Sequence, residues 1–267
     1  MAAPSGIPRH YAALSVAGRV RDHNEDAVLC CPQARLWAVA DGMGGKQRGE
    51  VASELALEAL LAAVSNGQGL RRAVHIANLA VYEAGRERGV DMGTTLVAIR
   101  MGSRRDYELA WVGDSRAYCV GPAQIRQLSQ DHSWVQTMID AGQLTPEAAR
   151  RDPRRNIVLR CLGQTVEGFD IGYAKGELRT GESLLLCSDG LSGELDDSEI
   201  LHVCQSGETP AAMVRELIDK AEAAGGRDNI SCIVLGPNIT TTSNLETAMR
   251  ALLRRLIPSP SKTDERP

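Results

Sequence analysis

The feature that most constrains the fold is the way strand-like and helix-like segments are grouped. Apolar runs rich in β-branched residues, which are typical of strands, occur at 12–18, 26–30, 35–42, 94–100, 107–114, 115–120 and 124–129. Two segments with helical periodicity, 50–64 and 70–88, separate the first three runs from the rest. Because crossover helices do not separate consecutive strands, the pattern predicts an α+β layered sandwich rather than a doubly wound parallel sheet.

The rest of the chain predicts one large domain with two extensions. Residues 130–165 depart from the strand pattern and are interpreted as a partly helical flap. A strand at 182–187, a helix at 210–226 and a final strand at 229–236 then resume the core. We therefore predict an N-terminal extension over 1–11, a folded core domain over 12–236 and a partly disordered C-terminal tail over 237–267.

Composition excludes several classes of protein. With 43% hydrophobic and 24% charged residues in 267, the chain is expected to fold without help from disulfides. Its seven cysteines are scattered without CxxC pairs, so they are interpreted as small buried hydrophobes in a reducing compartment. A net charge of −4 argues against a nucleic-acid partner. No membrane span or secretory signal is recognised, and we expect a cytoplasmic monomer.

The informative chemistry lies in acidic residues that follow apolar strands in glycine-rich or turn-like settings. They are Glu25, Asp26, Asp41, Asp114, Asp189 and Asp228. Any single Asp-Gly pair is more often an ordinary turn. Several carboxylates at one edge of a sheet, however, are costly unless cations neutralise them. Oxygen donors without histidine or thiolate favour Mg²⁺ or Mn²⁺, and the glycine at 42 would let its carbonyl approach a metal closely.

The sequence segments VADGMGG, GTTL, VGDSRAY, SDGL and GRDNIS, in this order, resemble the motifs of the PPM family of metal-dependent protein phosphatases, the type 2C phosphatases of bacterial type. The resemblance covers roughly residues 12–236 and implies a four-layer α-β-β-α sandwich. It also implies hydrolysis of phosphoserine and phosphothreonine in proteins by a metal-bridged hydroxide, without a phosphoenzyme intermediate.

The resemblance assigns expected roles to individual residues. Arg21 would bind the substrate phosphate, and Asp41 would bridge two Mn²⁺ or Mg²⁺ ions, with the Gly42 carbonyl completing one site. Asp189 and Asp228 would hold the second ion. Glu25 and Asp26 would ligate or orient metal-bound waters. Asp114, together with Asp189, would recruit a third ion. Asn229 would support its neighbour Asp228.

One position departs from many eukaryotic relatives, which have histidine within the DGxGG motif where this chain has Met43. The proton for the leaving group must then come from a metal-bound water or another residue. His23 and His132 are the nearest candidates, although a structural role is favoured for both. The flap arginines, Arg150, Arg151, Arg154, Arg155 and Arg160, would either steer acidic phosphopeptides or form a solvated face.

Two other functions stay open at this point. A pseudophosphatase would keep the fold and signal by binding alone, but no expected metal ligand is missing. A metal-dependent phosphoesterase acting on nucleic acid or a small phosphate ester fits the net negative charge less well. For the favoured reading, the partners are phosphoproteins and a cognate eukaryotic-like Ser/Thr kinase, while the sequence identifies neither the physiological substrate nor the metal used in the cell.

Overall fold

The computed structural model describes residues 9–44, 48–103, 105–166, 169–207 and 209–239. The strands are β1 (Arg9–Val16), β2 (Asp26–Cys31), β3 (Leu36–Met43), β4 (Gly93–Thr94), β5 (Leu96–Met101), β6 (Asp106–Val112), β7 (Arg116–Val120), β8 (Ile125–Gln127), β9 (Gly172–Glu177), β10 (Ser183–Cys187) and β11 (Ile230–Ile239). The helices are α1 (Arg48–Ser65), α2 (Leu70–Arg88), α3 (Trp134–Asp140), α4 (Pro146–Ala149), α5 (Asp189–Ser192), α6 (Asp197–Ser206) and α7 (Pro210–Ala224).

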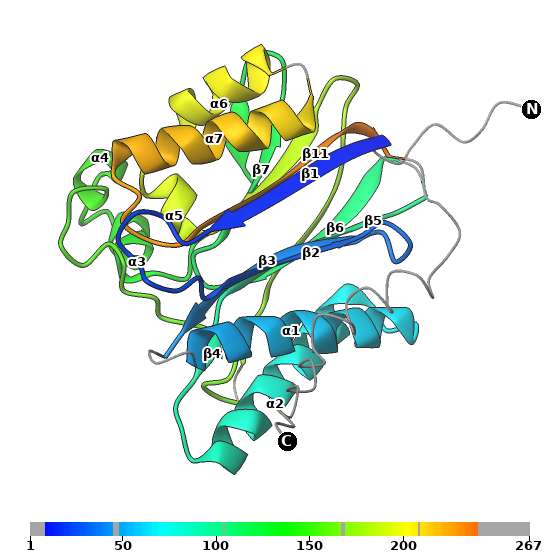
Figure 1. Cartoon of the computed structure of the whole chain (residues 1–267), viewed down its shortest axis with the longest axis vertical. Coiled ribbons are helices and arrows are strands. Elements are labelled where there is room, and N and C mark those ends of the chain that lie inside the picture. Colours follow the sequence, from blue (N-terminus) through cyan, green and yellow to red (C-terminus); the bar gives the residue numbers. More distant parts are fainter. Residues whose placement is uncertain (1–8, 45–47, 104, 167–168, 208, 240–267) are drawn as a thin grey trace, which may run out of the picture.

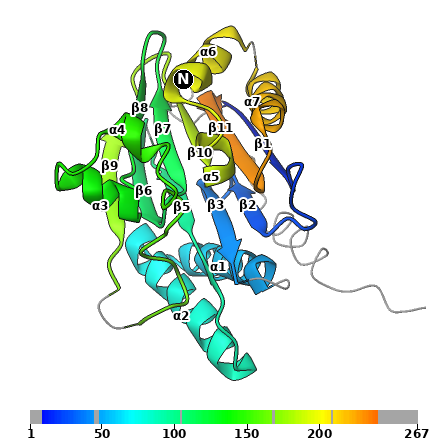
Figure 2. The same cartoon turned by 90° about the vertical axis from the view of Figure 1, so that its left-hand side faces the viewer.

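The elements form four layers, as Figure 1 shows from the side. One sheet has the strand order β1-β11-β10-β7-β8 and carries α6 and α7 on its outer face. The second has the order β2-β3-β5-β6-β9, with the short β4 beside β3, and carries α1 and α2. The strand pairs within both sheets are antiparallel. The predicted α-β-β-α sandwich is confirmed, and Figure 2 shows the same layers after a quarter turn.

Three apolar layers hold the sandwich together. The central layer lies between the sheets and contains residues such as Trp37, Ile99 and Leu186. The other two lie between each sheet and its helices, around Leu60 on one side and Leu217 on the other. Strand side chains alternate between the two faces of a sheet, so a strand covered on both faces is apolar throughout. The run of buried residues from Leu36 to Ala40 in β3 has this character.

Helix α1 buries a wider stripe than the one opposite its glutamates. Glutamates four residues apart predict an opposite face formed by Val51, Leu55 and Leu61. Of these only Leu61 is buried, whereas Ala52 and Ala56 are fully buried against the sheet. The small side chains of Ala52 and Ala56 allow the helix to lie close to β3, and larger residues such as Leu57 and Leu60 complete the packed face. In α2 the predicted stripe from Leu70 to Val81 is buried as expected.

Two elements carry no strong sequence signal. Strand β9, GYAKGE, is polar and glycine-rich because it is an edge strand, paired only with β6. Helix α6 begins at a capping box, in which Asp196 and Glu199 each accept a hydrogen bond from the other's backbone N–H. The predicted flap does contain helices, α3 and α4.

The predicted domain limits stay predictions. Strand β1 begins at Arg9 and β11 ends at Ile239, so the sheet extends a few residues beyond both limits. The amphipathic patch at 245–257 of the predicted tail lies outside the described residues.

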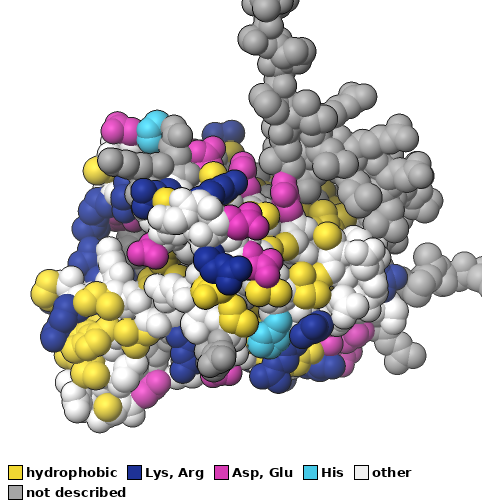
Figure 3. Space-filling view, turned by 90° about the horizontal axis from the view of Figure 1, so that it is seen from below, with side chains coloured by type: hydrophobic (Ala, Val, Ile, Leu, Met, Phe, Trp, Pro, Cys, Tyr) yellow, Lys and Arg dark blue, Asp and Glu magenta, His cyan; other side chains and the backbone are white. Residues whose placement is uncertain are grey.

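The surface agrees with the charge argument made from composition. Figure 3 shows the molecule from below, where basic and acidic side chains are interspersed on the visible face rather than gathered into one basic patch. Within the described part of the chain, no helix combines the length and the apolar character that a membrane span requires.

Candidate metal and phosphate site

The predicted aspartates come together at one end of the sandwich, where the two sheets meet. Asp26 and Asp41 are directly opposite each other in the β2–β3 register. Asp189, which begins α5 in the other half of the sandwich, hydrogen-bonds the Asp41 carboxyl group. The Ser188 hydroxyl also crosses between the sheets and donates to Asp26 Oδ2 over 2.8 Å. Residues more than 140 positions apart in sequence therefore form one cluster.

Crowding of these carboxyl groups perturbs their protonation. Burial, followed by repulsion from Asp189 and other aspartates, raises the pKa of Asp26 to about 7 from its usual 3.8. Burial, together with the charges of Asp26, Asp189, Asp114 and Asp228, holds the pKa of Asp41 well above its usual range. The pKa of Asp114 is also raised well above the usual range by burial and by Asp189. Such a cluster favours protons or cations.

The backbone around Asp41 is fixed by the GTTL segment. The Asp41 carbonyl accepts hydrogen bonds from the Thr94 hydroxyl (2.9 Å) and the Thr95 N–H (2.8 Å), and the Asp41 N–H donates to the Thr95 hydroxyl (3.1 Å). At the next residue, a Cβ on Gly42 would lie 2.6 Å from the Glu25 carbonyl and closer still to that of Gly49. Glycine is therefore required at position 42 by close backbone packing.

Arg21, Asp228 and Asn229 join the N-terminal loop to this end of the sheet. The exposed Arg21 guanidinium pairs with Asp228 Oδ2 at 2.8 Å. Buried Asn229 accepts from the Glu25 N–H (2.8 Å) and donates to the carbonyls of Ala17 (3.2 Å) and His23 (2.7 Å). Asn229 thus fixes the loop that carries Arg21 and Glu25. The sequence predicts only that Asn229 supports its neighbour Asp228, whereas in the structure it also holds this loop.

Glu25 contacts the start of α1 and acts on Arg21. Its carboxyl group lies against Gly49 at the start of α1, where an added Cβ would come within 2.8 Å of it. Its charge acts on Arg21, whose pKa is raised, mainly by the hydrogen bond to Asp228. The Glu25 carbonyl is also occupied, since it accepts from the Gly42 N–H and the Ser53 hydroxyl.

The donor set fits hard cations. Two buried oxygens, Asp26 Oδ1 and Asp189 Oδ1, have no hydrogen-bond partner. Unpaired buried carboxylate oxygens are costly, and a cation would satisfy them. Oxygen donors of this kind suit Mg²⁺ and Mn²⁺. Among the described side chains, no three of His, Cys, Asp and Glu are already arranged to enclose an ion. Ligation would therefore need side chains to adjust around it.

Sequence reasoning did not single out Arg116 and Asp131, which lie next to Asp114. The partly buried Arg116 guanidinium pairs with the buried Asp131 carboxylate at 2.7 Å, and its Nη1 donates to the Tyr118 hydroxyl over 3.1 Å. Arg116 belongs to the VGDSRAY motif, so the signal was present in a segment already recognised. The pair ties the first residues of the flap to β7.

The two histidines have structural contacts. His132 Nδ1 accepts from the Gly113 N–H at 3.2 Å, and its ring stacks on Trp111 at a centroid distance of 6.4 Å. Burial lowers the pKa of His132. His23 is exposed and contributes its carbonyl to the contact with Asn229. Met43 is half-buried and lines a separate hollow with Tyr82 and other residues.

The flap arginines divide into two groups. Arg154 pairs with Asp152 and lies over the Trp134 ring, 3.6 Å from its centroid, while Arg160 pairs with Asp170. The second group, Arg150 and Arg155, lines a cleft of about 580 Å³ whose wall also includes Asp114 and Asp189. Arg151 is exposed. Two of the five predicted arginines therefore lie beside the aspartate cluster.

Comparison with known proteins agrees with the motifs. The family described as "Protein phosphatase 2C" matches residues 19–233. The serine/threonine protein phosphatase PstP of Mycobacterium tuberculosis is 40% identical over 233 residues, which is 84% of this chain but 44% of PstP. The chain thus spans less than half of that relative. The serine/threonine phosphatase stp of Listeria monocytogenes is 36% identical over 239 residues, covering 84% of this chain and 94% of stp.

A solved structure of the PstP catalytic domain in complex with two manganese ions superposes with a TM-score of 0.75 at 37% identity, covering 84% of this chain and 96% of that one. The similarity therefore extends from the motifs to the whole arrangement of strands and helices.

Proposed function

This chain belongs to the protein phosphatase 2C family, and from that premise we propose that it is a metal-dependent phosphatase that hydrolyses phosphoserine and phosphothreonine in proteins. The observation that carries the proposal is the buried aspartate cluster, whose members raise one another's pKa and leave two oxygens unpaired. A cluster of this kind is stabilised near neutral pH by the protons or cations that neutralise it.

The proposed ligands follow from this placement. Asp41, Asp189 and Asp228, with the Gly42 carbonyl, would hold the two principal ions. Two more aspartates, Asp26 and Asp114, would complete or extend the set. When bound, two Mn²⁺ or Mg²⁺ ions lower the pKa of water and neutralise phosphoryl charge. The observations in favour are the oxygen-only donors and the two manganese ions reported for the PstP catalytic domain.

The chain's own residues would position the substrate. Arg21 is exposed at the rim and held by Asp228, so its planar fork can donate hydrogen bonds to two phosphoryl oxygens as substrate arrives. Asn229 holds the loop that carries Arg21, and Thr94 and Thr95 fix the Asp41 peptide. Glu25 is placed between Arg21 and α1, where it would orient rather than hold an ion.

Position 43 is methionine, so no histidine there can donate the proton that the leaving alkoxide needs. His132 is bound through Nδ1 to a backbone N–H and stacked on Trp111, which supports a structural role. We propose that water in the site supplies this proton, because Met43 has no titratable group.

The predicted substrates, kinase partner, oligomeric state and cellular location are part of this proposal. Phosphoproteins are the substrates, and a eukaryotic-like Ser/Thr kinase would supply them. The relatives named above are phosphatases, which gives the pseudophosphatase alternative no support. The monomeric state and the cytoplasmic location stay predictions from the sequence.

A comparison of substrates tests the function directly. Phosphate release from a phosphothreonine peptide, a nucleotide and a DNA oligonucleotide would be measured with Mn²⁺, with Mg²⁺ and with chelator. We expect metal-dependent turnover of the peptide far above that of the other two. Preferential hydrolysis of the nucleotide or of DNA would overturn the proposal in favour of a different phosphoesterase.

A further inference from the structure

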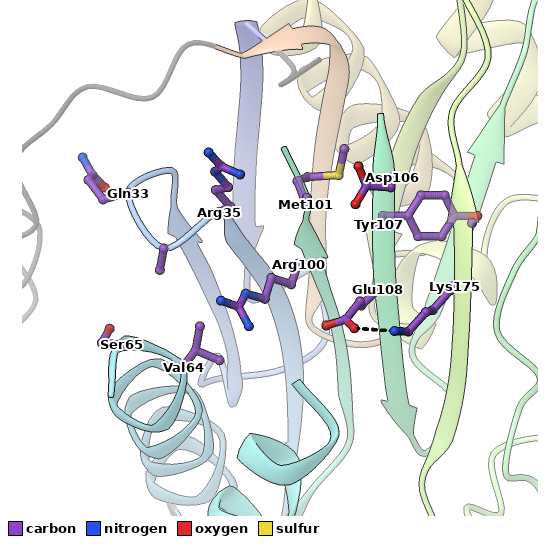
Figure 4. Close-up of a pocket in the computed structure, with 13 residues that line it drawn as sticks. Gln33, Arg35, Val64, Ser65, Arg100, Met101, Asp106, Tyr107, Glu108 and Lys175 are labelled. Atoms are coloured by element: carbon purple, nitrogen blue, oxygen red, sulfur yellow. Dashed lines mark ion pairs between the residues drawn. The ribbon is translucent and has the colours of Figure 1, made fainter. Parts of the chain in front are cut away.

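A second polar cavity lies at the opposite end of the β2-β3-β5-β6-β9 sheet from the aspartates. Its volume is about 490 Å³, and it is bounded by the β2–β3 turn, the end of α1 and strands β5, β6 and β9. Figure 4 shows its lining residues. Arg35 ends the β2–β3 turn and is six residues before Asp41 of β3, which corresponds to roughly 20 Å at the usual rise per residue. The cavity is therefore separate from the proposed catalytic site.

Arg35 has an unusual backbone conformation. Its φ of 55° is positive, and no other non-glycine residue among those described has a positive φ. The turn holds it there, since the Arg35 N–H donates to the Pro32 carbonyl (3.1 Å) and its own carbonyl accepts from the Met101 N–H (2.9 Å). Glycine would adopt this conformation without steric cost. An arginine that occupies it suggests that its side chain serves a purpose.

Arg100 supplies a second guanidinium to the same cavity. It is opposite Leu36 in the β3–β5 register, which places it next to Arg35 across the strands. Its Nη1 donates a long hydrogen bond of 3.4 Å to the Gln68 carbonyl. Within the described residues, neither Arg35 nor Arg100 forms an ion pair with a carboxylate.

The carboxylates of the cavity have partners of their own, although Glu108 is also directly opposite Arg100 in the β5–β6 register. Glu108 pairs with Lys175 at 3.0 Å and accepts from the Tyr173 hydroxyl at 2.8 Å. In Figure 4 this pair lies on the far side of the cavity from Arg35. The Asp106 carboxylate lies against Gly102, where an added Cβ would overlap it. The two arginines are thus the groups available to an incoming ligand.

We propose that this cavity, named here the distal arginine pocket and defined by Arg35 and Arg100, binds a phosphate group. Arg35 of the β2–β3 turn and Arg100 of β5 each offer the planar donor fork that suits phosphoryl oxygens. Gln33 and Ser65, which also line the cavity, add neutral polar atoms. A phosphatase that acts on phosphoproteins meets such groups both as inorganic phosphate and on phosphorylated chains.

Amide chemical shifts of the full chain, titrated with inorganic phosphate and then with a phosphothreonine peptide, test the proposal. We expect saturable shifts at Met101, Gly102 and Gly176, with half-saturation at about 1 mM or below, in addition to shifts at the aspartate site. In the Arg35→Gln/Arg100→Gln variant, binding at the distal arginine pocket should weaken at least about tenfold while shifts at the aspartate site persist. The peptide arm decides whether a phosphate carried on a chain also binds there.

A matched control removes two exposed arginines from α2, as Arg72→Gln/Arg88→Gln, and should leave the distal shifts unchanged. Unaltered peptide turnover by the Arg35→Gln/Arg100→Gln variant would establish that it folds, and Arg35→Lys should retain part of the binding. Phosphate-induced shifts confined to the aspartate site would overturn the proposal. So would distal shifts that are equally strong without the two arginines. Both results are independent of whether the enzyme acts on phosphoproteins.

Discussion

Replacement of Asp189 by asparagine should change stability in opposite directions with and without metal. Asp189 hydrogen-bonds the Asp41 carboxyl group, and its charge raises the pKa of Asp26, Asp41 and Asp114. Two charges about 4 Å apart interact by about 4 kcal/mol at an effective dielectric constant of 20. Partial protonation already relieves some of this repulsion. We therefore expect the metal-free variant to be more stable than wild type by about 1–2 kcal/mol at pH 8.

The same substitution should abolish the response to metal. A cation at 100 times its dissociation constant stabilises the folded state by about 2.7 kcal/mol. For a domain of this size, 1 kcal/mol corresponds to a Tm change of about 2–4 °C. Wild type should thus gain about 5–10 °C on addition of Mn²⁺, and Asp189→Asn much less. Turnover of a phosphothreonine peptide should fall at least about 100-fold if a ligand is lost.

Thermal unfolding in chelator and in Mn²⁺, with peptide kinetics on the same samples, measures these effects. The exposed Asp219 of α7 provides the control, because Asp219→Asn removes one carboxylate far from the cluster and should change neither quantity. Asp189→Asn with full activity and a wild-type Tm increase in Mn²⁺ would refute the assignment of Asp189 as a ligand. A lower metal-free Tm would refute the electrostatic argument.

Three further predictions concern pH, the phosphate ligand and the supporting loop. Since the folded state raises the pKa of Asp26 to about 7, it retains a proton that the unfolded chain loses near pH 4. Metal-free stability should therefore fall as pH rises from about 4 to 7, by roughly 4 kcal/mol for this group, and a flat profile in chelator would contradict the burial argument. Arg21→Lys keeps the charge but loses the fork, so KM for phosphopeptide should rise about tenfold with Tm unchanged; equal KM would exclude the proposed role. Asn229→Ala removes the contacts to Glu25, Ala17 and His23, which should lower the free energy of unfolding in urea by roughly 2–4 kcal/mol, and an unchanged midpoint would argue against the loop-fixing role.

The order of segments along the chain was enough to predict the layered sandwich. Grouped strands around two helices, with a further helix before the last strand, left few other arrangements. The polar edge strand β9 was not predicted, because an edge strand has one neighbour and needs little apolar sequence. Helix α6 was not predicted either. In α1, periodicity identified the face on which Leu61 is buried and Val51 and Leu55 are partly buried, but it did not single out the fully buried Ala52 and Ala56. Their small side chains let the helix lie close to β3.

The aspartates, glycines and Arg21 of the candidate site could be named from sequence, because short motifs carry fixed residue types in a fixed order. The sequence by itself therefore determined which groups are available and that they would demand cations. Only the tertiary structure decided that Asp26, Asp41, Asp114 and Asp189 perturb one another's pKa, and that the Glu25 carboxyl group lies against the start of α1. It also decided that Arg35 and Arg100, which are 65 residues apart in the sequence and belong to no recognised motif, share a cavity. The physical reason is that electrostatic coupling and cavities depend on distances in space, and strand pairing, rather than proximity along the chain, sets those distances.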